Sequence, residues 1–197
     1  MAGLGLLEEL GVERYYLAAG MLEKKVEAAL AVYAARRGGL PLYAGGVYTL
    51  VLRENGVGAR GCEPGRGVYL GCLPPGGEPV FAAGVDGRRL RGLRRLEGRR
   101  LAPGVYALAR VVSGVVVERS YFTVGPGLEV RPLEPPCPTL LNRVFELLGA
   151  REAREKEVVE VLAAELGVGR GEARRLLLEW EGRLCVSRLP GGVVRLL

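Results

Sequence analysis

The 197-residue sequence contains no histidine, no glutamine and no isoleucine, and its one aspartate is Asp86. Without histidine there is no imidazole base, no His-containing catalytic triad and no facial metal triad, and a single aspartate excludes an aspartate pair. The sequence also has no Gly-x-x-x-x-Gly-Lys-Ser/Thr phosphate-binding loop. We therefore expect a protein that is not an enzyme and that uses no cofactor or metal.

Long apolar runs are absent as well. No stretch of about 18 apolar residues occurs, and Glu8 and Glu9 interrupt the apolar start of the chain, so we expect neither a membrane span nor a signal peptide. These features predict a cytoplasmic protein without a membrane partner. Few amides beside abundant Arg, Glu, Gly and Pro are typical of a thermophile.

The four cysteines are not arranged in Cys-x-x-Cys pairs, so they do not indicate a zinc site. Cys62 and Cys72 flank a turn-rich segment, whereas Cys137 and Cys185 lie far apart in the sequence. Disulfides are unusual in the cytosol except in hyperthermophiles. A Cys62–Cys72 disulfide is the pairing we favour, and buried free thiols are the alternative.

Residues 139–197 show three helical patterns followed by a short hairpin. The first two patterns, 139–148 and 156–166, are followed by Gly149 and Gly167, which are suitable helix stops. The third pattern, 170–180, has apolar residues at helical spacing, and strands at 183–188 and 193–197 follow it. This order resembles the winged helix-turn-helix superfamily. The resemblance implies DNA binding first and protein docking second.

The third helix and the hairpin of this segment are rich in arginine. Such side chains suit phosphate contacts and guanine recognition, and the candidates are Arg170, Arg174, Arg175, Arg183 and Arg188, with Arg195 beside them. Nearby glutamates partly cancel their charge, and only Asn55 and Asn142 supply amides in the whole chain. We expect weak base readout, and a solvated arginine-rich surface is the alternative.

Residues 41–133 are predicted to form a central β-domain. Short runs of Val, Tyr, Leu and Phe alternate with Gly and Pro, as in an antiparallel barrel or sandwich. An OB-like barrel and an immunoglobulin-like sandwich fit equally well. The fold class is therefore α+β, with strands expected at 47–53, 68–72, 79–85, 105–112, 115–124 and 128–133.

Positive charge is concentrated between residues 88 and 100. This segment holds seven arginines against Glu97, and its net charge equals the formal +6 of the whole protein. It is a candidate phosphate-binding strip, made of Arg88, Arg89, Arg91, Arg94, Arg95, Arg99 and Arg100. The alternative is an arginine-rich helix held to the core by leucines at intervals of three. We also expect one nearby aromatic to be exposed for stacking on single-stranded DNA, among Tyr69, Phe81, Tyr121 and Phe122.

Residues 1–40 are predicted to be a helical lead-in, with helices at 4–10, 12–19 and 21–37. A degenerate winged helix completed by a hairpin within residues 41–52 is an alternative for this segment. The helix at 21–37 is also a candidate homodimer interface.

A Pro-rich linker at 134–138 is predicted to separate the β-domain from the last segment. A barrel, a linker and a winged helix in this order are similar in layout to the middle subunit of replication protein A. That layout implies single-strand binding by the barrel and partner docking by the winged helix.

Three hypotheses remain open. The first is a DNA-binding protein, for single or double strands, in transcription control or as a replication or repair accessory. The second is an adaptor whose winged helix docks a protein partner. The third is a regulator whose β-domain senses a small ligand.

Overall fold

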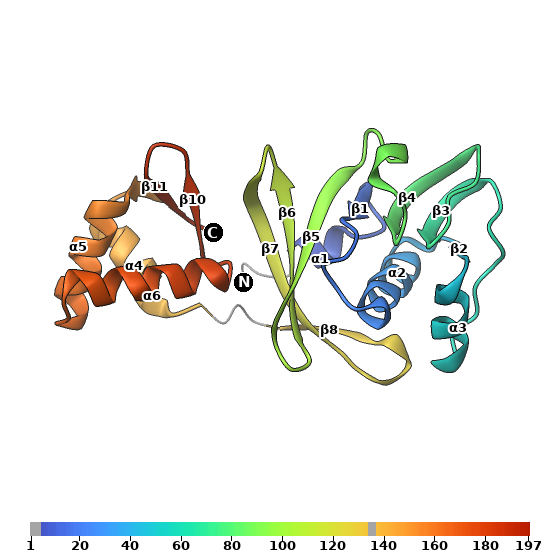
Figure 1. Cartoon of the computed structure of the whole chain (residues 1–197), viewed down its shortest axis with the longest axis horizontal. Helices are drawn as coiled ribbons and strands as arrows, with labels where there is room; N and C mark the ends of the chain where they lie inside the picture. Colours follow the sequence, from blue (N-terminus) through green and yellow to red (C-terminus); the bar gives the residue numbers. More distant parts are fainter. Residues whose placement is uncertain (1–4, 134–136) are drawn as a thin grey trace. The chain divides into compact units, whose positions relative to one another are not determined.

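The computed structural model describes residues 5–133 and 137–197, which form two compact units (Figure 1). The N-terminal unit holds the elements from α1 to β8 except residues 113–117, which are assigned to the C-terminal unit together with the elements from α4 to β11. The division falls at the predicted linker 134–138, of which residues 134–136 lie outside the described residues. Each unit has its own apolar core. Within the described ranges, no helix is long and apolar enough to cross a membrane.

A curled eight-stranded sheet forms the centre of the N-terminal unit (Figure 1). Across the sheet its strands are β2 (Leu42–Ala44), β3 (Gly65–Leu70), β4 (Gly77–Ala83), β1 (Tyr15–Leu17), β5 (Arg94–Ala102), β6 (Val105–Val112), β7 (Val115–Val124) and β8 (Val130–Leu133). The strands from β2 to β5 run parallel to their neighbours, whereas β5 with β6 and β7 with β8 are antiparallel. The chain is thus α+β, with a mixed sheet.

The prediction of an antiparallel OB-like barrel or immunoglobulin-like sandwich in residues 41–133 is therefore wrong. Parallel strands usually need a crossover of about a dozen residues, most often a helix, so short Gly- and Pro-rich segments between strands favour hairpin turns. Instead, segments 71–76 and 84–93 carry the chain back across one face of the sheet, where Leu73, Leu90 and Leu93 pack. The similarity in layout to replication protein A depended on an OB-like barrel and loses its basis.

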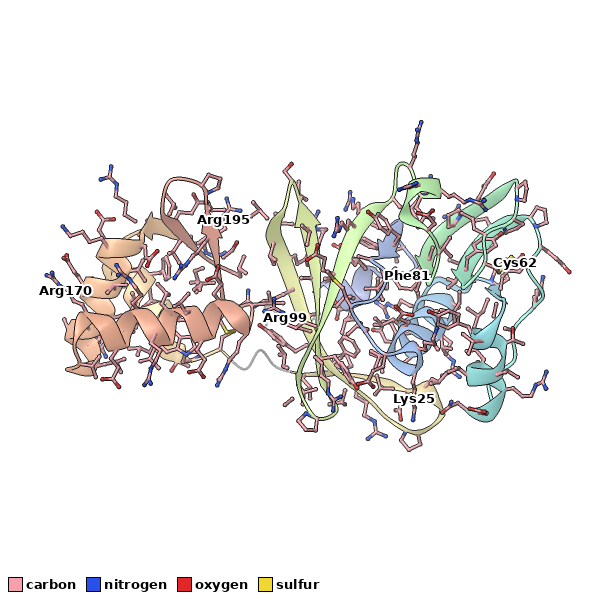
Figure 2. All side chains as sticks on the ribbon, viewed as in Figure 1. Lys25, Cys62, Phe81, Arg99, Arg170 and Arg195 are labelled. Atoms are coloured by element: carbon pink, nitrogen blue, oxygen red, sulfur yellow. A yellow bond between two sulfur atoms is a disulfide. The ribbon has the colours of Figure 1, made fainter. Side chains whose placement is uncertain are left out.

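Different elements cover the two faces of the sheet. Helix α2 (Lys24–Gly38), with α1 (Gly5–Glu9) and α3 (Val47–Glu54), packs on the face that carries Phe81 (Figures 1 and 2). Segments 71–76 and 84–93 pack on the other face, which carries Tyr69 and Ala82. Because successive strand residues point to opposite faces, the neighbours Phe81 and Ala82 belong to different cores.

The first forty residues are part of this unit and not a separate lead-in. Residues 12–19 were predicted to be helical, but β1 lies there, held between β4 and β5 with Tyr15 and Leu17 buried. Two neighbouring strands supply its backbone hydrogen bonds, and this tertiary effect overrides local helical periodicity. The helix predicted at 21–37 is α2, which ends at Gly38 and is followed by Gly39 in the left-handed conformation. Most of its apolar residues from Val26 to Ala35 are buried in the core of its own unit.

The strand predicted at 47–53 is helix α3. A short apolar run fits either structure by periodicity alone, and here Tyr48 and Leu52, four residues apart, form the buried side of a helix. The hairpin expected within residues 41–52, and with it the degenerate winged helix, is consequently wrong. The strands expected at 105–112 and 115–124 are confirmed as β6 and β7. They meet at Ser113 and Gly114, whose positive φ values suit a tight hairpin turn.

The C-terminal unit contains three helices and a small sheet. Its elements are α4 (Thr139–Leu147), β9 (Glu152–Arg154), α5 (Glu155–Leu166), α6 (Arg170–Gly182), β10 (Val186–Leu189) and β11 (Val193–Leu196), and the sheet is antiparallel in the order β10-β11-β9. Val144, Leu162 and Trp180 join the three helices in one core. The three predicted helices and the hairpin are present, whereas β9 was not predicted.

Two disulfides occur, one in each unit. Cys62 pairs with Cys72, the pairing that the sequence favoured. Cys137 pairs with Cys185, which is fully buried beside β10. Sequence spacing gave no reason to join Cys137 with Cys185, because 48 positions separate them and only folding brings them together.

Candidate nucleic-acid interface

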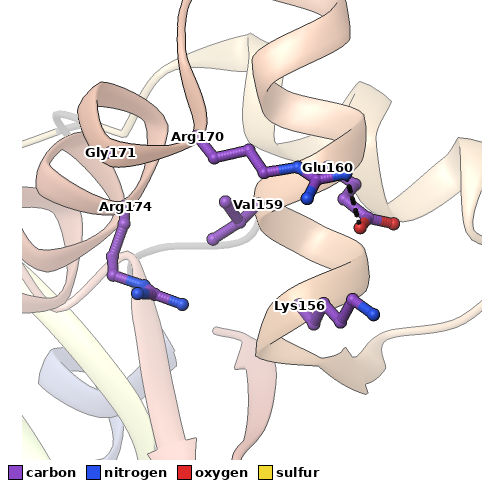
Figure 3. Close-up of a pocket in the computed structure, with 6 residues that line it drawn as sticks. All are labelled: Lys156, Val159, Glu160, Arg170, Gly171 and Arg174. Atoms are coloured by element: carbon purple, nitrogen blue, oxygen red, sulfur yellow. Dashed lines mark ion pairs between the residues drawn. The ribbon is translucent and has the colours of Figure 1, made fainter.

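A cation-lined hollow lies between the starts of α5 and α6 (Figure 3). Lys156 comes from the first turn of α5, and Arg170 and Arg174 come from the first two turns of α6. The hollow measures about 270 Å³, and Val159, Glu160 and Gly171 complete its lining. Three cations thus face one carboxylate here. Lys156 was not among the predicted residues, although it begins the second helical pattern of this segment, 156–166.

The three predicted arginines of α6 are exposed, and each forms an ion pair with a glutamate. Arg170 lies 3.1 Å from Glu160, Arg174 lies 3.1 Å from Glu155, and Arg175 lies 3.8 Å from Glu172. Their side chains remain 61–78% exposed. Ion pairs between exposed side chains contribute only about 0–1 kcal/mol, so a phosphate group can replace the carboxylate at little cost.

The predicted arginines of the hairpin region are also paired. Arg188 on β10 contacts Glu181 at 3.2 Å and Glu155 at 3.6 Å, and it therefore shares Glu155 with Arg174. Arg183, just after α6, pairs with Glu179, and Arg195 on β11 pairs with Glu152 at 2.6 Å. The structure thus brings α5, α6 and the hairpin together around Glu155, but it neutralises much of their charge.

The arginine-rich segment 88–100 is not a helix and not one continuous strip. Arg88 and Arg89 lie in the short 3₁₀ helix η1 (Gly87–Arg89), Arg91 follows it, and the remaining arginines lie on β5. Residues on a strand alternate between its two faces, so the β5 arginines are divided between them. The helical alternative fails because Leu90 and Leu96 belong to cores on opposite faces of the sheet.

Ion pairs also reduce the free charge of this segment. Arg94 pairs with Glu13 at 2.5 Å, Arg95 with Glu97 at 2.8 Å and Arg100 with Glu23 at 2.7 Å. Arg99 is exposed on β5. Within the described part of the chain no carboxylate forms an ion pair with Arg88, Arg89 or Arg91, all of which are exposed. Phosphate contacts in this segment would therefore concentrate at residues 88–91.

The four aromatic residues proposed for base stacking are all buried. Tyr69, Phe81, Tyr121 and Phe122 are each 0% exposed. Tyr69 stacks on Tyr43 with ring centroids 4.8 Å apart, and Phe122 stacks on Tyr106 at 5.7 Å. The expectation that one of the four offers a face to single-stranded DNA is wrong, because all four are covered. Phe81 and Phe122 belong to the core beneath α2, and Tyr69 belongs to the core on the other face of the sheet.

A buried carboxyl group in the N-terminal unit was not predicted. Glu27 on α2 is 3% exposed and accepts a hydrogen bond from the hydroxyl of Tyr48 on α3. Burial raises the pKa of Glu27, against the opposing effects of Tyr48 and Lys24. Burial, together with Glu27, also raises the pKa of Tyr48. Glu27 lies among alanines on α2, and these alanines are the only feature of the sequence that indicates its burial.

Among the described side chains, no group of three Cys, Asp or Glu residues is placed to hold a metal ion. Comparison with known proteins finds no matching family model, no matching curated protein and no matching solved structure. The function must therefore be inferred from the geometry of the two units.

Proposed function

We propose that this protein binds duplex DNA without catalysing a reaction and that its C-terminal unit acts as a winged helix. The observation that carries the proposal is the order of elements α4-β9-α5-α6-β10-β11 with a three-stranded sheet β10-β11-β9. In helix-turn-helix proteins the second helix of the pair enters the major groove and the first crosses the backbone. Here α6 would be the recognition helix, α5 its partner, and β10 with β11 the wing.

The turns within this unit support the proposal. Gly167 ends α5 in the left-handed conformation, and Val168 and Gly169 alone follow before α6 begins. The wing turns through Gly191 and Gly192, both with positive φ. A short helix-helix connection fixes the angle between α5 and α6, so Lys156, Arg170 and Arg174 face the same hollow.

The charges in this unit indicate contact with the phosphate backbone more than base readout. To contact phosphates, the arginines of α6 and the wing must leave their glutamate partners. Asn and Gln side chains, which recognise adenine, are scarce in the sequence. We therefore propose modest affinity, low sequence specificity and strong dependence on salt. A role in transcription control or as an accessory in replication or repair agrees with these properties. The burial of the four candidate stacking aromatics favours duplex over single-stranded DNA.

The test is fluorescence anisotropy of the full chain with a labelled duplex across a salt series. Lys156→Ala/Arg170→Ala/Arg174→Ala removes the cations of the hollow, and Arg143→Ala is the matched control because it removes an exposed arginine paired with Glu165 at 2.8 Å. Each lost phosphate contact reduces the magnitude of the slope of log K against log salt by about 0.9. For the triple variant, the magnitude of this slope should therefore fall by roughly 2.7. Equal slopes for the triple variant and Arg143→Ala would contradict the proposed interface.

Protein docking is a second candidate function, favoured by one observation on α6. Leu178 is 48% exposed on this helix, between residues whose charges are already compensated. A neutral helix face with an exposed leucine suits a protein partner better than a polyanion. The absence of any duplex binding at low salt would move this candidate to first place.

A further inference from the structure

The parallel part of the sheet contains a second candidate site that is independent of DNA binding. β1 and β4 are neighbouring parallel strands, but the chain leaves them toward opposite faces. After β1 it enters α2 on one face, and after β4 it enters segment 84–93 on the other. Ligands of open α/β sheets bind beyond the carboxyl ends of such a pair of strands.

A hollow of about 400 Å³ lies at this position. Ala19 and Gly20, which follow β1, line it together with Gly84 and Val85, which follow β4. Its volume falls in the range of roughly 300–1,000 Å³ that is typical of small-molecule sites. The strand topology and the position of the cavity thus indicate the same place.

The floor of the hollow is held by close packing around Tyr48. All four parallel strands from β2 to β1 are followed within three residues by a glycine with positive φ, namely Gly20, Gly46, Gly71 and Gly84. A Cβ atom on Gly84 would lie 2.5 Å from the Tyr48 hydroxyl oxygen, and one on Gly71 would also overlap the Tyr48 ring. These two glycines form a slot for the ring, and the hydroxyl of Tyr48 is then directed to Glu27.

Positive charge at the hollow is available to an anionic group. The Nζ atom of Lys24 lies 5.4 Å from the ring centroid of Tyr48, and among the described residues no carboxylate forms an ion pair with Lys24. Glu27 also lines the hollow, and burial raises the pKa of this carboxyl against the opposing charge of Lys24. Glu23 is the N-cap residue of α2, but its side chain accepts no hydrogen bond from the backbone N–H groups of the first turn.

The rest of the lining suits a larger molecule than an inorganic anion. The carboxylate of Asp86, the residue before η1, accepts a hydrogen bond from the backbone N–H of Arg88 at 3.1 Å. Its remaining lone pairs can accept hydroxyl donors. Leu22 and Val85 supply apolar wall. The cation suits a phosphate group, and the carboxylate can accept hydrogen bonds from the hydroxyl groups of a sugar. The apolar wall suits the face of a ring.

We propose that this hollow binds a nucleoside monophosphate, with the phosphate at Lys24, the ribose hydroxyls at Asp86 and the base against Leu22 and Val85. Such a site makes the N-terminal unit a ligand-binding unit in its own right. The proposal does not depend on DNA binding by the C-terminal unit.

The test is isothermal titration calorimetry of the full chain with AMP, GMP, CMP and UMP, and with ribose 5-phosphate and inorganic phosphate as smaller probes. Lys24→Ala removes the cation of the hollow. Lys25→Ala is the matched control, because Lys25 is also exposed on the first turn of α2 but does not line the hollow (Figure 2). A charge-assisted phosphate contact predicts at least a tenfold loss of affinity in Lys24→Ala and none in Lys25→Ala.

Three results would overturn the proposal. The first is the absence of binding by all four nucleotides. The second is an equal affinity of Lys24→Ala and Lys25→Ala, both checked by circular dichroism for an intact fold. The third is binding of inorganic phosphate as tightly as any nucleotide, which would reduce the hollow to a simple anion site.

Discussion

The Cys137–Cys185 disulfide should contribute a large share of the stability of the C-terminal unit. It joins residues 48 positions apart, and the loop-entropy relation gives about 4 kcal/mol at 25 °C for a loop of this length. The Cys62–Cys72 disulfide spans 10 positions, for which the same relation gives about 2.7 kcal/mol. Cys137→Ser is the suitable perturbation, because Cys185 is fully buried and tolerates a free thiol better than a serine hydroxyl.

The two units can be measured separately because Trp180 is the only tryptophan and lies in the C-terminal core, 7% exposed. Its fluorescence during guanidinium denaturation follows that unit. Cys137→Ser should lower the free energy of unfolding reported by Trp180 by about 4 kcal/mol. Cys62→Ser, whose disulfide belongs to the N-terminal unit, should leave the Trp180 transition unchanged. A loss below about 1 kcal/mol in Cys137→Ser, or equal shifts in the two variants, would refute this reasoning.

Two further predictions concern the surroundings of Tyr48. Because the pKa of Glu27 is raised above its ordinary value of 4.5, the folded state binds the proton more tightly than the unfolded state, so this group lowers stability as pH rises from about 4.5 through its folded pKa. Relative to Glu27→Gln, the wild type should therefore become less stable across that window in denaturation experiments, and a parallel pH dependence of the two proteins would contradict the buried position. Gly84→Ala should destabilise the protein by about 1–3 kcal/mol more than Gly92→Ala. Both glycines have positive φ, but a Cβ at Gly92 meets open space whereas one at Gly84 meets Tyr48. Equal losses in thermal denaturation would show that Gly84 is not part of a slot for Tyr48.

Sequence reasoning succeeded where the signals were local. The helices of the C-terminal unit have apolar residues at helical spacing and glycine stops, and α5 ends at Gly167 as predicted. β6 and β7 were equally clear because alternating apolar residues flank a turn with positive φ. These elements need little help from distant parts of the chain.

Sequence reasoning failed where contacts between distant segments of the chain determine the structure. β1 spans Tyr15–Leu17 alone and exists because β4 and β5 lie on either side of it. The short crossovers at 71–76 and 84–93 contain no α-helix, so the parallel sheet was not visible in the sequence. The same topology determines the hollow beside Lys24, which could not be predicted once an antiparallel domain was assumed.

The sequence predicted which arginines belong to the candidate interface, but it did not predict their ion pairs with glutamates. Arg170 and Arg174 do face the same hollow, but their pairing with Glu160 and Glu155 depends on the angle between α5 and α6. Counting charges along the chain cannot show which arginines are compensated. For the same reason segment 88–100 looked like a single basic strip, although Arg94, Arg95 and Arg100 are paired.

The most direct test of the central proposal is the affinity of the full-length protein for duplex DNA and for the matching single strand, measured by anisotropy across a salt series. A winged helix that contacts the phosphate backbone predicts tighter binding to the duplex and a log–log salt slope of several units. A preference for the single strand, or no binding to either form at low salt, would contradict it.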